Sequence, residues 1–271
     1  MPCARVDACC WLGYDTHPVM AGHSHSANIK FRKDRVDAKR AKTFSKLSRM
    51  ITVAARSGGD PDANAKLRLA VDKARVVSMS KEAIERAVKK GMGEVGGSDF
   101  EEALYEGYGP GGVAVLMEIL TDNRNRTAAD VRRIFEKHGG GLAASGAVAW
   151  QFERRSVFSV DPAGGWDEDR LTEVVLQCGA DDLRREGDAF TVLAPSTAFA
   201  AVKAGLDRAG VPLRGAELAH VPVQRVEVTD VAVAQRIVAL LEALDDNDDV
   251  QGVYSNEDFT DSVARALEEK A

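Results

Sequence analysis

The chain has 271 residues, enough for two or three compact domains, and 45% of them are hydrophobic while 29% are charged. This composition is typical of a globular protein in water, and no apolar run is long enough to cross a bilayer, so we expect no membrane partner. Three of the four cysteines lie within residues 1–19, leaving only Cys178 beyond them. This distribution argues against a disulfide framework and predicts a cytoplasmic protein.

The net charge of −6 conceals an uneven distribution. Residues 20–92 contain 18 Lys and Arg against 7 Asp and Glu, a net charge of +11, whereas residues 93–271 contain 17 against 33, a net charge of −16. Lys and Arg also cover helix surfaces that bind nothing. An asymmetry of this size nevertheless favours a polyanionic partner for the basic segment.

Residues 1–19 have no helical or strand periodicity, and their apolar stretch "CCWLG" is too short for a secretion signal. We therefore expect the working chain to begin at Met20. Residues 1–19 would then be an untranslated stretch or a dispensable, disordered leader.

Residues 20–95 predict a basic bundle of three helices. The first helix is expected from about Asp34 to Arg56, with an apolar face opposite a basic face. The apolar face contains Phe44, Leu47, Ile51, Ala54 and Ala55, and the basic face contains Arg35, Lys39, Lys42, Lys46 and Arg49. After "SGGDP", Pro61 is expected to open a second helix, and Ser80 to cap a third that ends at Gly91.

The segment after the glycine-rich hinge "GMGEVGGSD" predicts strands and helices. A strand at 113–120 is followed by a helix in "RTAADVRRIFEKHGG", where Thr127 and Asp130 have capping-box spacing, and by a strand at 146–153. From Val157 the predicted order is strand, helix, strand, strand, helix, strand, which is the split βαβ pattern of ferredoxin-like domains. A strand, a helix and the strand "DVQGVYSN" then complete the unit that preceded Val157.

The predicted fold class is therefore α+β, with an N-terminal three-helix bundle and two ferredoxin-like α/β domains, one inserted in the other. The outer α/β domain would comprise residues 99–155 plus 223–271. The inserted domain would comprise residues 156–222.

The motifs predict no enzyme. "GYGPGG" has the glycine spacing of a dinucleotide-binding loop, but a strand follows it where a helix is required, so we expect a tight turn. "DDNDDVQG" lacks the glycine and the glutamate of a calcium loop, and a solvated turn is expected. Because no nucleophile or metal-ligand motif is present, we expect no catalytic residue, no metal, no cofactor and no small-molecule substrate.

Arg124 and Arg126 precede a predicted helix, beside Asn123 and Asn125. The asparagines could make a turn and a cap while the arginines pair with acidic neighbours. The arginines could equally form a second patch that contacts phosphates, because a helix N-terminus and a guanidinium both favour anions.

Six ordered stretches resemble the YebC/PmpR family, from Met20 to about Phe259. They are "MAGHSHSANIKFRK", "DAKRAKTFSKL", "ITVAARSGGDPDANAKLRLAVDKAR", "YEGYGPGGVAV", "LTDNRNRT" and "LDDNDDVQGVYSN". The resemblance implies an all-helical N-terminal domain followed by two α/β domains, in a cytoplasmic nucleic-acid-binding regulator without known catalysis. Some members are described as DNA-binding transcriptional regulators and others as ribosome-associated factors. The chain departs from the family at His25-Ser26, where members usually carry Lys-Trp.

These observations predict a non-enzymatic, nucleic-acid-binding regulator of gene expression, a DNA-binding transcriptional regulator of the YebC/PmpR type. A translation factor bound to the ribosome or its RNA is the main alternative, and an adaptor that binds only proteins is a third. The basic face carries few side chains suited to base edges, so its sequence specificity should be poor. The expected phosphate-binding residues are Lys30, Arg32, Lys33, Arg35, Lys39, Lys42, Lys46, Arg49, Arg124 and Arg126.

Overall fold

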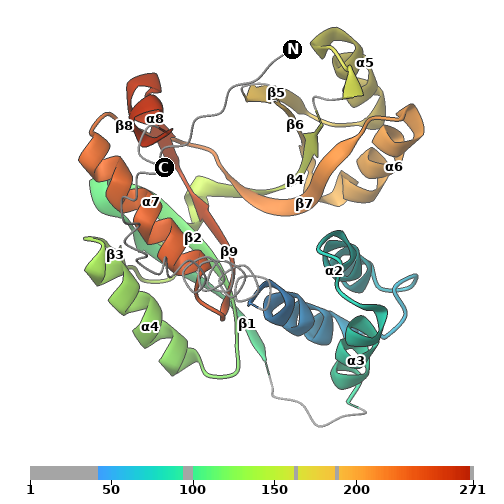
Figure 1. The fold of residues 1–271 in the computed structure, drawn as a ribbon, viewed down its shortest axis with the longest axis horizontal. Coiled ribbons are helices and arrows are strands. Elements are labelled where there is room, and N and C mark those ends of the chain that lie inside the picture. Colours follow the sequence, from blue (N-terminus) through green and yellow to red (C-terminus); the bar gives the residue numbers. More distant parts are fainter. Residues whose placement is uncertain (1–41, 94–99, 162–163, 187–188, 269–271) are drawn as a thin grey trace, which may run out of the picture. The chain divides into compact units, whose positions relative to one another are not determined.

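The computed structural model describes residues 42–93, 100–161, 164–186 and 189–268, and Figure 1 shows their fold. The chain divides into a unit of residues 1–43 and a unit of residues 44–271, and the second unit contains nearly all of the described elements. The predicted leader of residues 1–19 lies outside the described residues. None of the helices in the described ranges is both long and apolar enough to span a bilayer.

Three helices share an apolar core in the basic segment: residues 42–55, α2 (Ala65–Val76) and α3 (Lys81–Gly91). Ile51, Leu67 and Ala74 are fully buried there, as the helical periodicity predicts. Ser80 caps α3 by accepting the Ala83 N–H, so this predicted cap is confirmed.

The predicted start of the second helix at Pro61 was wrong. Asn64 is the N-cap of α2, because its side-chain oxygen accepts the Leu67 N–H at 3.1 Å. Its amide nitrogen also donates to the carbonyls of Ala54 and Gly58. A proline offers neither group, so the helix begins after Asn64.

The first sheet is antiparallel, and two helices cover one of its faces. Its strand order is β3-β1-β2-β9, with bounds Gly141–Leu142, Glu101–Tyr108, Ala114–Thr121 and Val250–Ser255. Helices α4 (Arg124–Lys137) and α7 (Val231–Asp245) pack on it through Phe135, Ile237 and Leu240. The short 3-10 helix η1 (Pro110–Gly112) joins β1 to β2, so "GYGPGG" is the predicted tight turn into a strand.

The second sheet has the ferredoxin-like order β5-β6-β4-β7, and all neighbouring strands are antiparallel. Its strands are β4 (Phe152–Val160), β5 (Asp182–Glu186), β6 (Ala189–Pro195) and β7 (Leu213–Pro222). Helices α5 (Glu168–Cys178) and α6 (Phe199–Ala209) bury their apolar sides against Phe158 and Val192. Helix α6 follows the 3-10 helix η4 (Ser196–Ala198). The predicted α+β fold class is confirmed.

The strand predicted at residues 146–153 was wrong. Gly146, Val148 and Ala149 donate their backbone N–H groups to the Glu106 carboxylate, so these groups cannot join a strand ladder. A 3-10 helix, η2 (Ala149–Gln151), follows, and β4 then runs through residues 155 and 156, where the sequence suggested a domain boundary. The domain limits themselves stay a prediction.

Three short elements complete the described fold. Strand β8 (Val226–Val228) lies parallel to β10 (Glu257–Phe259) in a two-stranded sheet, and α8 (Asp261–Glu268) follows. Neither β10 nor α8 is indicated by a pattern in the sequence. Both are shorter than the windows over which periodicity is recognised.

Candidate nucleic-acid interface

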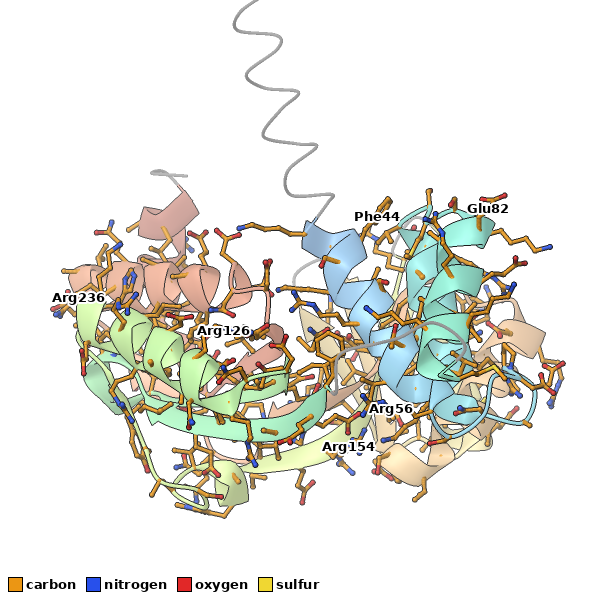
Figure 2. All side chains as sticks on the ribbon, turned by 90° about the horizontal axis from the view of Figure 1, so that it is seen from below. Phe44, Arg56, Glu82, Arg126, Arg154 and Arg236 are labelled. Carbon is orange, nitrogen blue, oxygen red and sulfur yellow. The ribbon has the colours of Figure 1, made fainter. Side chains whose placement is uncertain are left out.

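Half of the ten predicted phosphate-binding residues can be located. Lys42 is exposed at the first described turn of the helix of residues 42–55, and Lys46 and Arg49 follow on the same helix. Arg124 and Arg126 lie in the first turn of α4, from which Arg126 projects in Figure 2. The other predicted contacts lie outside the described residues: Lys30, Arg32, Lys33, Arg35 and Lys39.

Lys46 and Arg49 are covered by the segment that joins α7 to β9. The Lys46 ammonium donates to the backbone carbonyl of Asp245 and pairs with its Oδ1 at 3.3 Å. Arg49 Nη1 donates to the Asp248 carbonyl at 2.7 Å and to Asp249 Oδ1 at 2.9 Å. Only 16% of the Lys46 side chain and 23% of the Arg49 side chain are exposed, so this part of the predicted basic face is covered by other residues of the chain.

The Asp249 carboxylate connects this helix to α4. Besides Arg49, it accepts from Arg126 Nη2 at 2.8 Å, from Thr127 Oγ1 at 2.7 Å and from Thr121 Oγ1 at 3.2 Å. Burial by itself would raise the Asp249 pKa, but the hydrogen bonds from Arg126 and Thr127 and the charges of both arginines hold this pKa below its usual range. Asp249 therefore stays ionised, and the solvated turn expected at "DDNDD" was wrong for this residue.

The start of α4 also differs from the prediction. Asn123, not Thr127, is the N-cap, because its side chain accepts the Arg126 N–H at 3.1 Å. Thr127 lies buried inside the helix, where its hydroxyl reaches Asp249, so the capping box was wrong. Asparagine is as good a cap as threonine, and position 123 leaves the buried hydroxyl available to the carboxylate.

Arg124 and Arg126, in the first turn of α4, pair with acidic neighbours. Arg126 Nη2 lies 2.8 Å from Asp122 Oδ1, in addition to its bond to Asp249. Arg124 Nη1 lies 3.8 Å from Glu101 Oε2 with both side chains exposed, an arrangement that contributes little stability. This is the cap-and-pair alternative of the sequence analysis. Contact of Arg124 and Arg126 with phosphates stays a prediction.

An exposed aromatic pair borders the glycine-rich loop after α4. The Tyr108 hydroxyl and Trp150 Nε1 both donate to the Ala147 carbonyl at 3.0 Å, which fixes the two rings. Trp150 is 66% exposed. An exposed, fixed indole can stack on an unpaired base. Neither residue was predicted as a contact, and the one signal for each in the sequence is a neighbouring glycine-rich stretch.

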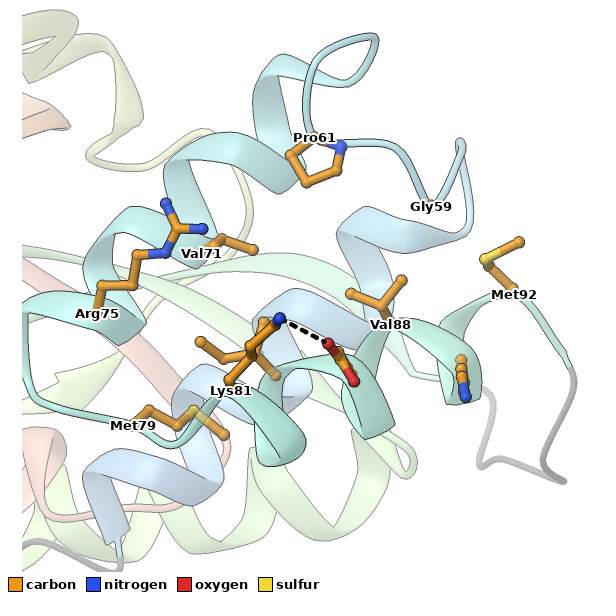
Figure 3. A pocket seen from close by; sticks show the side chains of 11 residues that line it. Gly59, Pro61, Val71, Arg75, Met79, Lys81, Val88 and Met92 are labelled. Atoms are coloured by element: carbon orange, nitrogen blue, oxygen red, sulfur yellow. Dashed lines mark ion pairs between the residues drawn. The ribbon is translucent and has the colours of Figure 1, made fainter.

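A cleft of about 510 Å³ opens in the helical segment, between α2 and α3. Val71, Met79 and Val88 line it, and Lys81 and Arg75 stand at its edge (Figure 3). Their ion pairs with Glu85 and Asp72 are exposed and hold the two cations weakly. Cationic side chains thus remain accessible on this side of the bundle.

The described residues form no group of side chains suited to a metal ion. No three His, Cys, Asp or Glu side chains within those ranges are arranged to hold a metal ion. Glu118 lies 3.3 Å from His220 Nε2 and accepts a hydrogen bond from the Tyr254 hydroxyl at 3.2 Å. Burial and the Glu118 charge raise the Tyr254 pKa, so its phenol remains protonated and acts as a hydrogen-bond donor.

The chain matches known proteins over most of its length. Residues 24–94 match the TACO1/YebC N-terminal domain, and residues 100–257 match the TACO1/YebC second and third domain. A relative in Halothermothrix orenii, named a probable transcriptional regulatory protein, is 47% identical over 253 residues, which cover 93% of this chain and 100% of the relative. One of the same name in Desulfatibacillum aliphaticivorans is 49% identical over 245 residues, covering 90% and 98%.

A solved structure agrees with these matches. The crystal structure of a conserved hypothetical protein from Aquifex aeolicus has a TM-score of 0.76 and 44% sequence identity to this chain. The similarity covers 83% of this chain and 93% of that one. The chain therefore belongs to the TACO1/YebC family.

Proposed function

We propose that this protein is a cytoplasmic, non-enzymatic regulator of gene expression that binds DNA through its basic helical segment. The observation that carries the proposal is the separation of charge. A net charge of +11 over residues 20–92 adjoins a net charge of −16 over residues 93–271. The names of the relatives, probable transcriptional regulatory proteins, support a role in transcription.

The accessible cations of this segment suit the DNA backbone. Lys42 is exposed on its helix, and Arg75, Lys81 and Lys89 are exposed around the cleft between α2 and α3. Each lysine that contacts a phosphate releases counterions, so the affinity should fall steeply as salt rises. Contacts of basic side chains with phosphates position a protein on the duplex but carry no sequence information. The proposal therefore predicts tight but weakly sequence-specific binding.

The test removes charge from the basic helix and from a matched surface. Replacing Lys39 and Lys42 by Glu should weaken binding of duplex DNA and make the slope of log K against log salt shallower by roughly 2, since each lost phosphate contact contributes about 0.9. Replacing Arg133 and Lys137 by Glu on α4 changes the net charge equally and should have little effect. Fluorescence anisotropy over a salt series measures both. Equal losses for the two variants, or unchanged affinity at low salt, would contradict the proposal.

Trp150 favours a second candidate function, in which the protein binds ribosomal RNA and assists translation. A fixed and exposed indole suits unpaired bases, which are abundant in folded RNA and rare in duplex DNA. Ultraviolet crosslinking in cells, followed by sequencing of the recovered DNA and of the recovered RNA, separates the two functions. Recovery of ribosomal RNA alone would replace the DNA-binding proposal with the translational one.

A further inference from the structure

We propose that the acidic segment of residues 245–249 is an intramolecular competitor of nucleic acid for the helix of residues 42–55. It binds Lys46 and Arg49, and nucleic acid must displace it before these two side chains can contact phosphates. The inference rests on the proposed function, because it assumes that this helix binds nucleic acid.

The acidic segment presents oxygen atoms much as a phosphate backbone does. It carries four carboxylates in five residues, at Asp245, Asp246, Asp248 and Asp249. Lys46 donates hydrogen bonds to one carboxylate and one backbone carbonyl of the segment, and Arg49 does the same. A guanidinium and an ammonium bind phosphate oxygens with the same donors. The two ligands therefore exclude each other at these side chains.

The two ends of the acidic segment are held with different strength. Asp249 is tied to α4 by Arg126, Thr127 and Thr121, so it should stay in place when Arg49 leaves. The Asp245 side chain is 73% exposed, and its carboxylate pairs with the Lys46 ammonium. Little of Lys46 is exposed, but the carboxylate side of this pair faces water, where salt screens the attraction and weakens it. Lys46 should therefore be the first of the two to exchange its partner.

The consequence is a reduced affinity for nucleic acid. When the binding-competent state is only partly populated, the apparent dissociation constant rises in inverse proportion to that population. The DNA affinity of the intact protein should thus be lower than the cations of the helix alone would give. Weakening the contact at Asp245 should raise the affinity without adding any positive charge to the helix.

Two substitutions separate this contact from general electrostatics. Asp245→Asn and Asp248→Asn each remove one negative charge, and both keep the backbone carbonyl that contacts the helix. Asp245→Asn in addition removes the charge of the carboxylate that pairs with Lys46, whereas Asp248 meets Arg49 through its carbonyl. We expect Asp245→Asn to tighten duplex binding several-fold and to steepen the salt dependence by about one lysine contact, and Asp248→Asn to do markedly less. Equal affinities for both variants would overturn the inference while leaving the proposed function intact. No binding by any of the proteins at low salt would overturn the proposed function, and the inference with it.

A zero-length carbodiimide crosslink reports the contact directly. This reagent joins an amine to a carboxylate only where the two are in contact, so peptide mass spectrometry of the full chain should find Lys46 linked to Asp245. Saturating duplex DNA should lower the yield of this link. The Lys203–Asp207 pair on α6, at 2.9 Å, is the internal control and should be unaffected. An unchanged Lys46–Asp245 yield in saturating DNA would show that binding does not displace the acidic segment.

Discussion

Replacing Glu106 by Gln tests the buried carboxylate that shapes the loop before β4. Glu106 is 3% exposed, and its oxygens accept the N–H groups of Gly146, Val148 and Ala149 at 2.6, 2.7 and 2.9 Å. A glutamine keeps one oxygen and places an NH₂ where the other stood. At least one N–H then faces a donor instead of an acceptor.

The expected loss follows from the bonds removed. Removing one partner so that a buried donor is left unsatisfied costs about 1–3 kcal/mol, and more where the lost partner is charged. The free energy of unfolding should therefore fall by roughly 2–4 kcal/mol. For a chain of this size that corresponds to a drop in melting temperature of about 5–15 °C. Glu136→Gln, the same change at an exposed site on α4, should cost less than about 0.5 kcal/mol.

The difference between the wild type and Glu106→Gln should depend on pH. Burial by itself would raise the Glu106 pKa, but the backbone N–H groups hold this pKa below its ordinary value of 4.5. A lowered folded-state pKa stabilises the fold above the unfolded-state pKa, and this contribution disappears as the pH falls through the folded-state pKa. The stability difference should therefore be constant near neutral pH and shrink in acid below pH 4.5.

Urea denaturation of wild type, Glu106→Gln and Glu136→Gln from neutral to acid pH measures these differences, and hydrogen exchange at Gly146 and Val148 localises them. A loss equal to that of the exposed control, or a difference that grows in acid, would refute the reasoning.

Two further substitutions test close packing and a buried amide. Gly91→Ala should destabilise the protein by about 1–3 kcal/mol, because the new Cβ would lie 2.2 Å from the Thr52 carbonyl oxygen, and this clash outweighs the helix preference of alanine. The control Gly215→Ala, where a Cβ meets no atom within 4 Å, should be close to neutral. Thermal unfolding measures both. Asn256→Ala should lower the free energy of unfolding by roughly 2–4 kcal/mol in urea titrations, because two hydrogen bonds are lost. The Asn256 side chain accepts the buried Ala114 N–H at 2.8 Å and donates to Gln151. A loss below about 1 kcal/mol would contradict this role.

The sequence by itself determined the elements whose signals are local. Helical periodicity placed Ile51 and Leu67 in the core, and Ser80 marked the start of α3 because a cap acts within three residues. The order of strands and helices after Val157 sufficed for the ferredoxin-like sheet, since chain connectivity leaves few ways to arrange it. Charge separation along the chain, also visible in the sequence, is what the proposed function rests on.

The tertiary structure decided the environment of the candidate site. Lys46 and Asp245 are 199 residues apart, and Arg49 and Asp249 are 200 apart, so no periodicity could reveal that these cations are paired instead of exposed. The same holds for Glu106, whose partners lie 40–43 residues away and convert a predicted strand into a loop. Buried charges require partners, and which partner each one finds depends on how distant segments of the chain meet.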